Sequence, residues 1–459
     1  MSSDTIAAIA TAPGKSGVAV VRVSGPDAFA LAEKLTRKPV LPGRISYRKI
    51  FRPSLSTTSS SSTSTLDFDF CLDDVILLSF AGPHSYTGED VVEFQCHGGS
   101  VTPRRILEAC FEAGARLARR GEFTERAFLN GKMDLSEAES VIDLIDAKTD
   151  AAADDALAHL GGERKRRYRE LYDRAVTLSS ELEHSLDVDE SDLTEEFVSH
   201  LNSSLFTLRS SLQEAIEQEK RSALLKDGAL VVLAGPPNAG KSSLLNALLG
   251  ESRAIVSDVP GTTRDSIEAW IDLGGIPVRL VDTAGLRGTS DAVESEGVRR
   301  AEELIAKADI VLMLGDVKVT RFQDKTVFIH SKCDLDCGAA GVRALPTQTH
   351  EHPATQTPLR VSAKTGEGLD ELRKFLISRL ADLEPRQNCR GLDLLTSACK
   401  ELESLHNSSL FTLTSSHSPD PVLAANVVRS VSETLGKLIG ATYSEDLLDA
   451  LFSRFCVGK

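Results

Sequence analysis

The stretch VVLAGPPNAGKSSLLNALL, residues 231–249, decides the fold of the region around it. It opens with an apolar run typical of a buried parallel strand and closes with leucines at helical spacing. Between them, the phosphate-binding pattern G-x-x-x-x-G-K-[ST] is filled by Gly235, Gly240, Lys241 and Ser242. A strand, a glycine-rich loop and a helix predict backbone N–H groups that bind a phosphate chain. We expect Lys241 to reach the β- and γ-phosphates and Ser242 to bind Mg²⁺.

Four shorter motifs follow this loop in a fixed order, at the ends of strand-like runs. They are GTTRD at residues 261–265, DTAG at 282–285, SKCD at 331–334 and SAK at 362–364. A threonine hydroxyl of the first can complete the Mg²⁺ shell, and Asp282 can hold Mg²⁺ through water. Each motif is weak alone, but their order predicts an α/β, Ras-like P-loop G domain.

We expect the nucleotide contacts to come from these motifs and their neighbours. The expected GTP-binding residues are Asn238, Ala239, Gly240, Lys241, Ser242, Ser243, Ser257, Asp258, Val259, Pro260, Gly261, Thr262, Thr263, Asp282, Thr283, Ala284, Gly285, Ser331, Lys332, Asp334, Ser362, Ala363 and Lys364. Within this set, Ser242 and Thr263 are the expected Mg²⁺ ligands.

Asp334 decides the choice of base. A carboxylate can accept two hydrogen bonds, from N1–H and the exocyclic amine of guanine, a pattern that adenine does not offer. The usual G-protein motif at this point is N-K-x-D, and this chain has Ser331 in place of the asparagine. Because serine is shorter and lacks the paired functions of an amide, we expect weaker binding with the guanine preference kept.

Hydrolysis needs a group that the usual motif does not supply here. The residue after DTAG is Leu286, where a Ras-like GTPase has a glutamine that orients the attacking water. Leucine cannot orient water. Another group must therefore position it and neutralise charge on the transferring phosphoryl.

Composition limits the class of protein. A chain of 459 residues is long enough for several domains, and 41% hydrophobic with 26% charged residues is ordinary for a globular protein. The net charge of −15 argues against general coating of a polyanion. Eight cysteines without a paired framework predict a reducing cytoplasm. With no signal peptide and no membrane-spanning apolar run, we expect a cytoplasmic protein that does not associate with membranes.

The rest of the chain predicts two further domains. Residues 5–119 read as α+β, interrupted by a serine-rich insertion at 54–64. Helical periodicity on both sides of the G domain predicts that this domain is inserted into an all-α domain. We interpret the charged run 163–169 as a solvated helix face. The predicted domains are 1–120 (α+β), 121–226 with 381–459 (helical) and 227–380 (G domain).

These motifs, with two others, resemble the tRNA-modification GTPase family MnmE, also called TrmE. The others are GEFTERAFLN at residues 121–130 and the terminal CVGK at 456–459, which GTPases that share only the G domain lack. The resemblance runs from residue 5 to 459, except for the serine-rich insertions. It implies a homodimer whose N-terminal domain dimerises and binds 5-formyltetrahydrofolate. It also implies a heterotetramer with the flavoprotein MnmG, which modifies carbon 5 of the wobble uridine of tRNA.

The resemblance further implies a K⁺ site that assists dimerisation of the G domains. Its implied ligands are Asn238, Ser257, Val259 and Thr262. An asparagine oxygen beside the phosphates suits a hard cation, and such a cation would do the electrostatic work of an arginine finger. The implied water-orienting residue is Glu294, which from the residues alone is equally a solvated helix carboxylate. Further candidates for bracing the switch segments are Arg264, Asp265 and Arg287.

The implied folate-binding residues are Arg22, Glu93, Lys132 and Lys459. Cations suit a glutamate tail, and a carboxylate suits the amine and ring N–H of a pteridine. Cys456, beside the implied folate site, is either a nucleophile or a packed or modestly exposed thiol. His97 is either a residue that reaches the site or a local turn residue.

Two other functions compete with this interpretation. A regulatory GTPase switch, for example in ribosome assembly, explains the G motifs but not the folate residues or the CVGK tail. An ATPase requires Asp334 and residues 261–265 to be ignored. The sequence leaves open which tRNAs are modified and whether glycine or ammonium is the donor.

Overall fold

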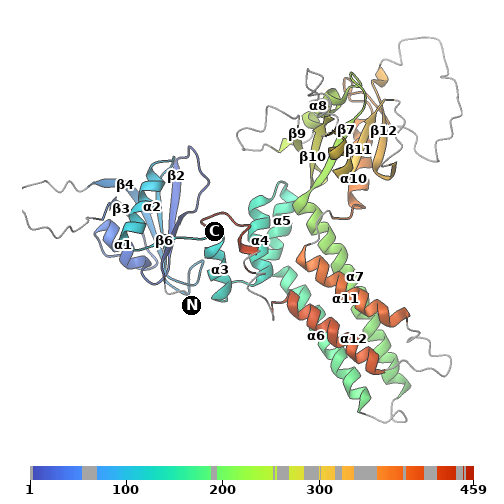
Figure 1. The fold of residues 1–459 in the computed structure, drawn as a ribbon, viewed down its shortest axis with the longest axis horizontal. Helices are drawn as coiled ribbons and strands as arrows, with labels where there is room; N and C mark the ends of the chain where they lie inside the picture. Colours follow the sequence, from blue (N-terminus) through green and yellow to red (C-terminus); the bar gives the residue numbers. More distant parts are fainter. Residues whose placement is uncertain are drawn as a thin grey trace, which may run out of the picture. The chain divides into compact units, whose positions relative to one another are not determined.

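The computed structural model describes residues 4–53, 70–187, 194–251, 254–255, 268–283, 299, 301–315, 323–334, 359–385, 389–407, 421–440, 448 and 451–459. By its contacts the chain forms two compact units (Figure 1). One unit joins residues 1–142 to 436–459, and the other spans residues 143–435. The predicted limits of three separate domains stay a prediction.

The first unit is built on a six-stranded sheet in the order β3-β4-β5-β2-β1-β6. Its strands are β1 (Ile6–Ile9), β2 (Val18–Ser24), β3 (Ile45–Phe51), β4 (Cys71–Phe80), β5 (Val91–His97) and β6 (Arg116–Leu117). Helices α1 (Ala28–Thr36) and α2 (Thr102–Ala113) cover one face of this sheet (Figure 1). Every second residue of β2 and β5 is apolar and faces these helices, so the residues between them lie on the opposite face.

The C-terminal tail packs within this same unit. Helix α3 (Glu122–Leu129) and the start of α4 (Leu135–Asp146) follow the sheet. Phe452 and Phe455 pack against Leu135 in a small apolar core. Gly458 has a φ of +104°, and a Cβ there would lie 2.3 Å from the carbonyl oxygen of Ile9. Only glycine allows this approach, which brings the end of the chain beside β1.

The second unit contains a seven-stranded sheet in the order β13-β12-β11-β7-β10-β9-β8. Its strands are β7 (Ala229–Ala234), β8 (Ala254–Ile255), β9 (Glu268–Leu273), β10 (Ile276–Asp282), β11 (Ile310–Leu314), β12 (Thr326–Ser331) and β13 (Leu359–Val361). All neighbours from β13 to β10 pair in parallel, and β9 pairs antiparallel with β10 and β8. Helices α8 (Lys241–Glu251) and α10 (Leu369–Ala381) cover one face, and helical residues 301–307 cover the other. Burial on both faces explains the continuous apolar runs of β7 and β11.

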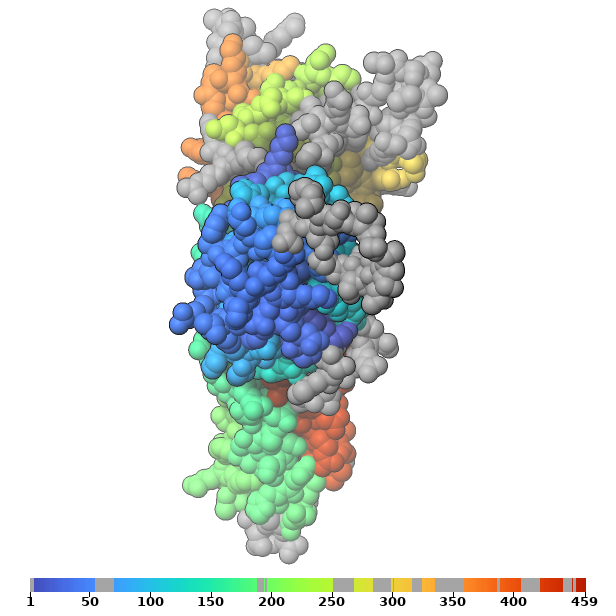
Figure 2. Space-filling view, turned by 90° about the vertical axis from the view of Figure 1, so that its left-hand side faces the viewer, coloured from blue at the N-terminus to red at the C-terminus, as the bar shows by residue number. Residues whose placement is uncertain are grey.

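Helices that precede this sheet in the sequence pack against helices that follow it. They are α5 (Asp150–Leu160), α6 (Glu163–Leu186), α7 (Glu195–Asp227), α11 (Arg390–Asn407) and α12 (Pro421–Leu438). Helix α7 leads directly into β7, and α11 returns beside it after the sheet is complete (Figure 1). Figure 2 shows the green residues of the earlier helices beside the red residues of the later ones. The predicted insertion of an α/β domain into a helical one is confirmed.

One sequence interpretation needs correction, and one strand has no clear signal in the sequence. In the charged run 163–169, Lys165, Arg166 and Arg169 are exposed, but Arg164 is buried and donates to Glu219 Oε1 at 3.1 Å. The run is therefore only partly solvated, because helix α7 supplies a carboxylate that pairs with its first arginine. Strand β3 was not predicted, since its alternation Ile-Ser-Tyr-Arg-Lys-Ile is weakly apolar. The serine-rich insertion lies outside the described residues.

Among the residues that the structure describes, none of the helices combines the length and the apolar character needed to cross a membrane.

Candidate nucleotide-binding site

The phosphate-binding loop begins where β7 ends. Gly235 has a φ of +142°, and a Cβ there would lie 2.3 Å from the carbonyl oxygen of Leu314 on the neighbouring strand β11. The chain can therefore leave the sheet at this point only with glycine. The loop then closes at Gly240, also at positive φ, and α8 begins at Lys241. The first amides of α8 thus face the space that the loop encloses.

The ammonium of Lys241 and the hydroxyl of Ser242 are held in place by the loop and its neighbours. Lys241 is buried, and its ammonium donates to the carbonyl oxygens of Gly235 (3.0 Å) and Pro236 (2.8 Å). Ser242 donates its hydroxyl to Asp282 Oδ2 at 2.5 Å, at the end of β10. A hydroxyl and a buried carboxylate held together at the loop form an oxygen-rich corner that suits Mg²⁺.

The loop after β12 is tied to the phosphate-binding loop. Ser331 donates to the carbonyl oxygen of Ala239 at 2.7 Å, and Lys332 Nζ donates to that of Asn238 at 2.7 Å. Asn238 and Lys332 both have positive φ, 60° and 62°, which is uncommon for residues other than glycine. The side chains of Ser331 and Lys332 thus hold the loop after β12 against the phosphate-binding loop.

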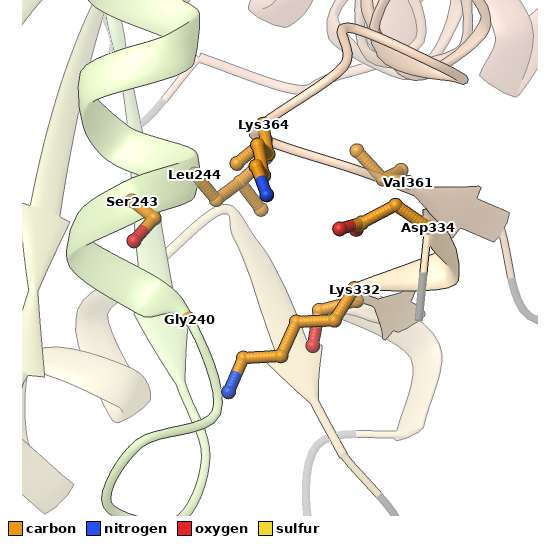
Figure 3. A pocket seen from close by; sticks show the side chains of 9 residues that line it. Gly240, Ser243, Leu244, Lys332, Asp334, Val361 and Lys364 are labelled. Atoms are coloured by element: carbon orange, nitrogen blue, oxygen red, sulfur yellow. The ribbon is translucent and has the colours of Figure 1, made fainter. Parts of the chain in front are cut away.

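Asp334 faces a cavity of about 260 Å³ (Figure 3). Its Oδ1 accepts a hydrogen bond from the hydroxyl of Ser362 at 2.7 Å, and Ser362 in turn accepts from the amides of Lys364 and Thr365. This chain of bonds fixes the plane of the carboxylate toward the cavity. The cavity is lined by Gly240, Ser243, Leu244, Ser331, Lys332, Asp334, Val361, Ala363 and Lys364.

A second polar cluster lies in the first unit, on the sheet face away from α1 and α2. Arg22 and Glu93 are direct partners in the register of β2 and β5, and Arg22 Nε donates to Glu93 Oε1 at 2.8 Å. The Arg22 guanidinium also lies 5.2 Å from the ring centre of Tyr86 and 5.6 Å from that of Phe123. Both distances are within the range of cation–π contacts.

The terminal residue joins this cluster. Burial lowers the pKa of the Lys459 ammonium, and nearby Arg22 lowers it too, while Glu93 acts in the opposite direction. The amide of Phe123 donates to the Lys459 carbonyl oxygen at 3.2 Å, which holds the tail in place. Two cations, one carboxylate and two aromatic rings therefore meet at one point of the first unit.

Almost the whole chain matches proteins of one kind. Residues 5–132 match the family described as GTP-binding protein TrmE N-terminus, and residues 135–456 match the MnmE helical domain. Over 475 residues, covering 100% of both chains, the protein is 40% identical to tRNA modification GTPase MnmE of Symbiobacterium thermophilum. The chain belongs to the MnmE (TrmE) family. Its member from Stutzerimonas stutzeri is 39% identical over 477 residues, 99% of each chain.

As a member of the MnmE family, the chain is a GTP hydrolase. A solved structure with similarity to it is the G domain of the T. maritima FeoB iron transporter. That domain is 29% identical, with a TM-score of 0.24, and the alignment covers 34% of this chain and 99% of that one.

Most of the predicted site residues that lie among the described residues of this MnmE-family chain come together in the structure. Motifs 238–243, 331–334 and 362–364 meet at the cavity and its phosphate-binding loop, and Asp282 and Thr283 stand at the end of β10 beside them. Several predicted residues lie outside the described residues. They are Ser257, Asp258, Val259, Pro260, Gly261, Thr262, Thr263, Arg264, Asp265, Ala284, Gly285, Leu286, Arg287 and Glu294.

In the first unit, three of the four predicted folate residues lie together, and the fourth has a different partner. Arg22, Glu93 and Lys459 meet, whereas Lys132 donates to the carbonyl oxygen of Pro83 at 3.0 Å. Cys456 is exposed. His97, at the end of β5, is held through Nδ1 by Asp73 Oδ1 at 2.7 Å.

Sequence reasoning missed the roles of several residues that line or support these sites. Leu244 and Val361 line the cavity but read as ordinary core residues of a helix and a strand. Tyr86 and Phe123 flank Arg22: Tyr86 lies in a loop, and Phe123 lies inside the GEFTERAFLN motif, which does not indicate a contact with Arg22. Their roles depend on which strands are neighbours, which periodicity does not give.

Proposed function

We propose that this GTPase acts with an MnmG-type flavoprotein to modify carbon 5 of the wobble uridine of tRNA. The observation that carries the proposal is the presence, in one chain of the MnmE family, of a nucleotide cavity and a separate cluster of Arg22, Glu93 and Lys459. A regulatory GTPase switch, as in ribosome assembly, has a use for the first site but none for the second. The working assembly is a homodimer joined to the partner in a heterotetramer.

The guanine base occupies the cavity that Asp334 faces. Its N1–H and exocyclic amine donate to the carboxylate that Ser362 holds in place. The phosphates lie along the loop at Gly235–Lys241, where Lys241 exchanges its neutral carbonyl partners for phosphate oxygens. This exchange is favourable because an ammonium binds an anion more strongly than it binds a carbonyl.

Two metal ions would assist the reaction. The hydroxyl oxygens of Ser242 and Thr263 would bind Mg²⁺ as hard ligands, and the carboxylate of Asp282 would hold the ion through water. The side-chain oxygen of Asn238 fits K⁺, together with Ser257, Val259 and Thr262. When bound, these cations neutralise the charge that develops on the transferring phosphoryl group. Glu294 orients the attacking water, in place of the glutamine that Leu286 replaces.

The first unit binds a reduced folate such as 5-formyltetrahydrofolate. The cations Arg22 and Lys459 attract the carboxylates of its glutamate tail, and Glu93 accepts from the amine and ring N–H of the pteridine. The half-buried ring of Tyr86 offers a flat apolar surface to the same ligand, and the fully buried ring of Phe123 supports Arg22. Lys132 contributes from the loop region where it donates to Pro83.

The test is reconstitution of the modification. The full chain, an MnmG-type partner, unmodified tRNA, a reduced folate, GTP and KCl are combined, and nucleosides are analysed by mass spectrometry. We expect a new C5-modified wobble uridine that requires GTP hydrolysis. The Glu294→Ala variant should bind GTP almost normally yet turn it over roughly a hundredfold more slowly and modify little tRNA. Normal GTP turnover with unmodified tRNA in every combination would favour the regulatory switch instead.

A further inference from the structure

Ser331 departs from the guanine-reading motif N-K-x-D, and the structure shows how its hydroxyl is used. We propose that Ser331 is a positioning residue that holds the phosphate-binding loop and gives the base no hydrogen bond. This chain then binds guanine nucleotides without reading N7 of the purine from position 331. The proposal rests on the proposed role of Asp334 as the base reader.

The single hydroxyl proton of Ser331 is already used in a hydrogen bond. A serine hydroxyl has one proton to donate, and Ser331 donates it to the carbonyl oxygen of Ala239 at 2.7 Å. N7 of guanine is an acceptor only, so it needs a donor. The remaining capacity of the Ser331 oxygen is to accept, which N7 cannot use. An asparagine amide has two N–H donors and one carbonyl, and it can therefore hold the loop and bind N7 together.

The cavity places Ser331 apart from the edge of the base that Asp334 reads. Figure 3 shows Asp334 on one side of the cavity and Gly240 on the other. Ser331 lies beside Gly240, since a Cβ on Gly240 would be 3.9 Å from both Cβ and Oγ of Ser331. A purine whose N1 edge meets Asp334 turns its imidazole ring, which carries N7, away from that carboxylate. Position 331 therefore lies on the side of the cavity that faces the imidazole ring. This chain has a serine there, where the usual motif has an asparagine.

The expected specificity follows from this geometry. Guanine remains preferred over adenine, because Asp334 reads N1–H and the amine. The chain should be indifferent to the atom at position 7, so 7-deazaguanosine nucleotides form a ligand class that it accepts as readily as the natural ones.

The test compares GDP with 7-deaza-GDP in the presence of Mg²⁺, by calorimetric titration of the full chain. For the natural sequence we expect dissociation constants within about twofold of each other, because no net hydrogen bond to N7 is lost. Ser331→Asn should bind GDP more tightly than 7-deaza-GDP by roughly two- to twelvefold, the usual worth of one hydrogen bond. A preference of the natural sequence for GDP above about threefold would overturn the proposal.

A second variant separates positioning from base reading. Ser331→Ala removes the bond to Ala239, so it should weaken GDP and 7-deaza-GDP equally and leave their ratio near one. A selective loss of GDP binding in this variant would show that Ser331 reads N7 and would contradict the proposal. Ser378→Ala is the matched control, since Ser378 is exposed on α10 and donates only locally, to Phe375.

Failure of the proposed base reader gives a different result. Asp334→Asn should lower the affinity for GDP and raise that for xanthosine diphosphate. If this variant binds GDP unchanged, the assignment of Asp334 fails. The ratio of GDP to 7-deaza-GDP, which depends only on the N7 edge, still decides the role of Ser331.

Discussion

The two polar sites of this chain hold their positive charges in opposite ways. In the nucleotide site, Lys241 and Lys332 donate to backbone carbonyl oxygens of the phosphate-binding loop. In the first unit, Arg22 is held by the carboxylate of Glu93. A carbonyl carries no net charge, so the exposed Lys332 keeps the field of its ammonium, whereas the Glu93 carboxylate cancels most of the field of Arg22. The nucleotide site is therefore set for a highly charged anion, and the first-unit cluster for a ligand with donors, acceptors and a smaller charge.

The largest effect should come from Lys241→Ala. Loss of charged hydrogen bonds to phosphate should weaken GTP binding roughly 10- to 150-fold. Binding of 5-formyltetrahydrofolate should not change, because the two sites lie in separate units. Both affinities are measured by calorimetric titration. Lys374→Ala, an exposed lysine on α10, is the control. An equal loss for both ligands would mean that the variant is misfolded and that the contrast between the sites is not being measured.

Acid should destabilise the second unit at milder pH than the first. Burial, together with the nearby charges of Arg164 and Arg167, lowers the pKa of His159 to about 3, although Asp155 Oδ2 lies 3.5 Å from Nδ1. The folded state thus binds the proton less readily than the unfolded state, whose ordinary value is 6.5. The contribution of neutral His159 to the free energy of unfolding is fully present above pH 6.5. It falls as the pH drops, by roughly 2 kcal/mol at pH 5.

In the first unit the corresponding group is Glu122. Burial alone would raise its pKa, but hydrogen bonds from Arg116, the Arg119 amide and Arg126 outweigh burial and lower it to about 2. The contribution of ionised Glu122 to the free energy of unfolding is fully present above pH 4.5, the ordinary pKa of a glutamate. It is lost as the pH falls toward 2. Hydrogen exchange of α5 and α3 peptides from pH 7 down to about pH 2 measures both losses. His159→Leu should remove the early loss in α5, and simultaneous loss in both units above pH 5 would contradict the assignment.

Arg22→Gln should affect only the folate site. We expect affinity for 5-formyltetrahydrofolate to fall roughly tenfold, because one charged hydrogen-bond donor is lost. GTP turnover by the isolated protein should not change. Arg104→Gln, in an exposed pair with Glu108 on α2, is the matched control. A folate affinity that is the same in both variants would remove Arg22 from the site.

The smallest effect should come from a contact inside the second unit. Lys148 Nζ lies 3.8 Å from the ring centre of Trp270 on β9, and Thr149 donates to the carbonyl oxygen of Gly275 at 2.7 Å. Lys148→Met should cost about 1 kcal/mol of stability. It should also change the fluorescence of Trp270, the single tryptophan of the chain. Lys307→Met, an exposed lysine, should do neither. Unchanged fluorescence in the first variant would contradict the contact.

The sequence was sufficient for features that depend on local order along the chain. The strand, glycine-rich loop and helix at residues 229–251 appear where the pattern predicts them, and the motif around Asp334 lies at the end of β12. The inserted G domain was also predictable, because helical periodicity resumes after it. These features follow from spacing and from glycines that no other residue can replace, such as Gly235.

The sequence was insufficient where contacts join distant residues. The bond from Arg164 to Glu219 joins two helices, and the bond from Ser331 to Ala239 joins two loops 92 residues apart. Neither spacing nor propensity specifies such pairs. The same holds for Tyr86 beside Arg22, which depends on a loop folding over the sheet. The side-chain network of each site is thus the part that only three-dimensional structure supplies.

In the function proposed above, the phosphate-binding loop is half of a catalytic site that K⁺ and a second G domain complete. GTP turnover in KCl against NaCl at equal ionic strength tests it most directly. Asn238→Gly is the informative variant, because Asn238 has a φ of 60° that glycine adopts without strain while losing the side-chain oxygen. We predict turnover at least about tenfold faster in KCl for the natural sequence, and no preference in the variant. Equal rates in both salts for the natural sequence would contradict the claim.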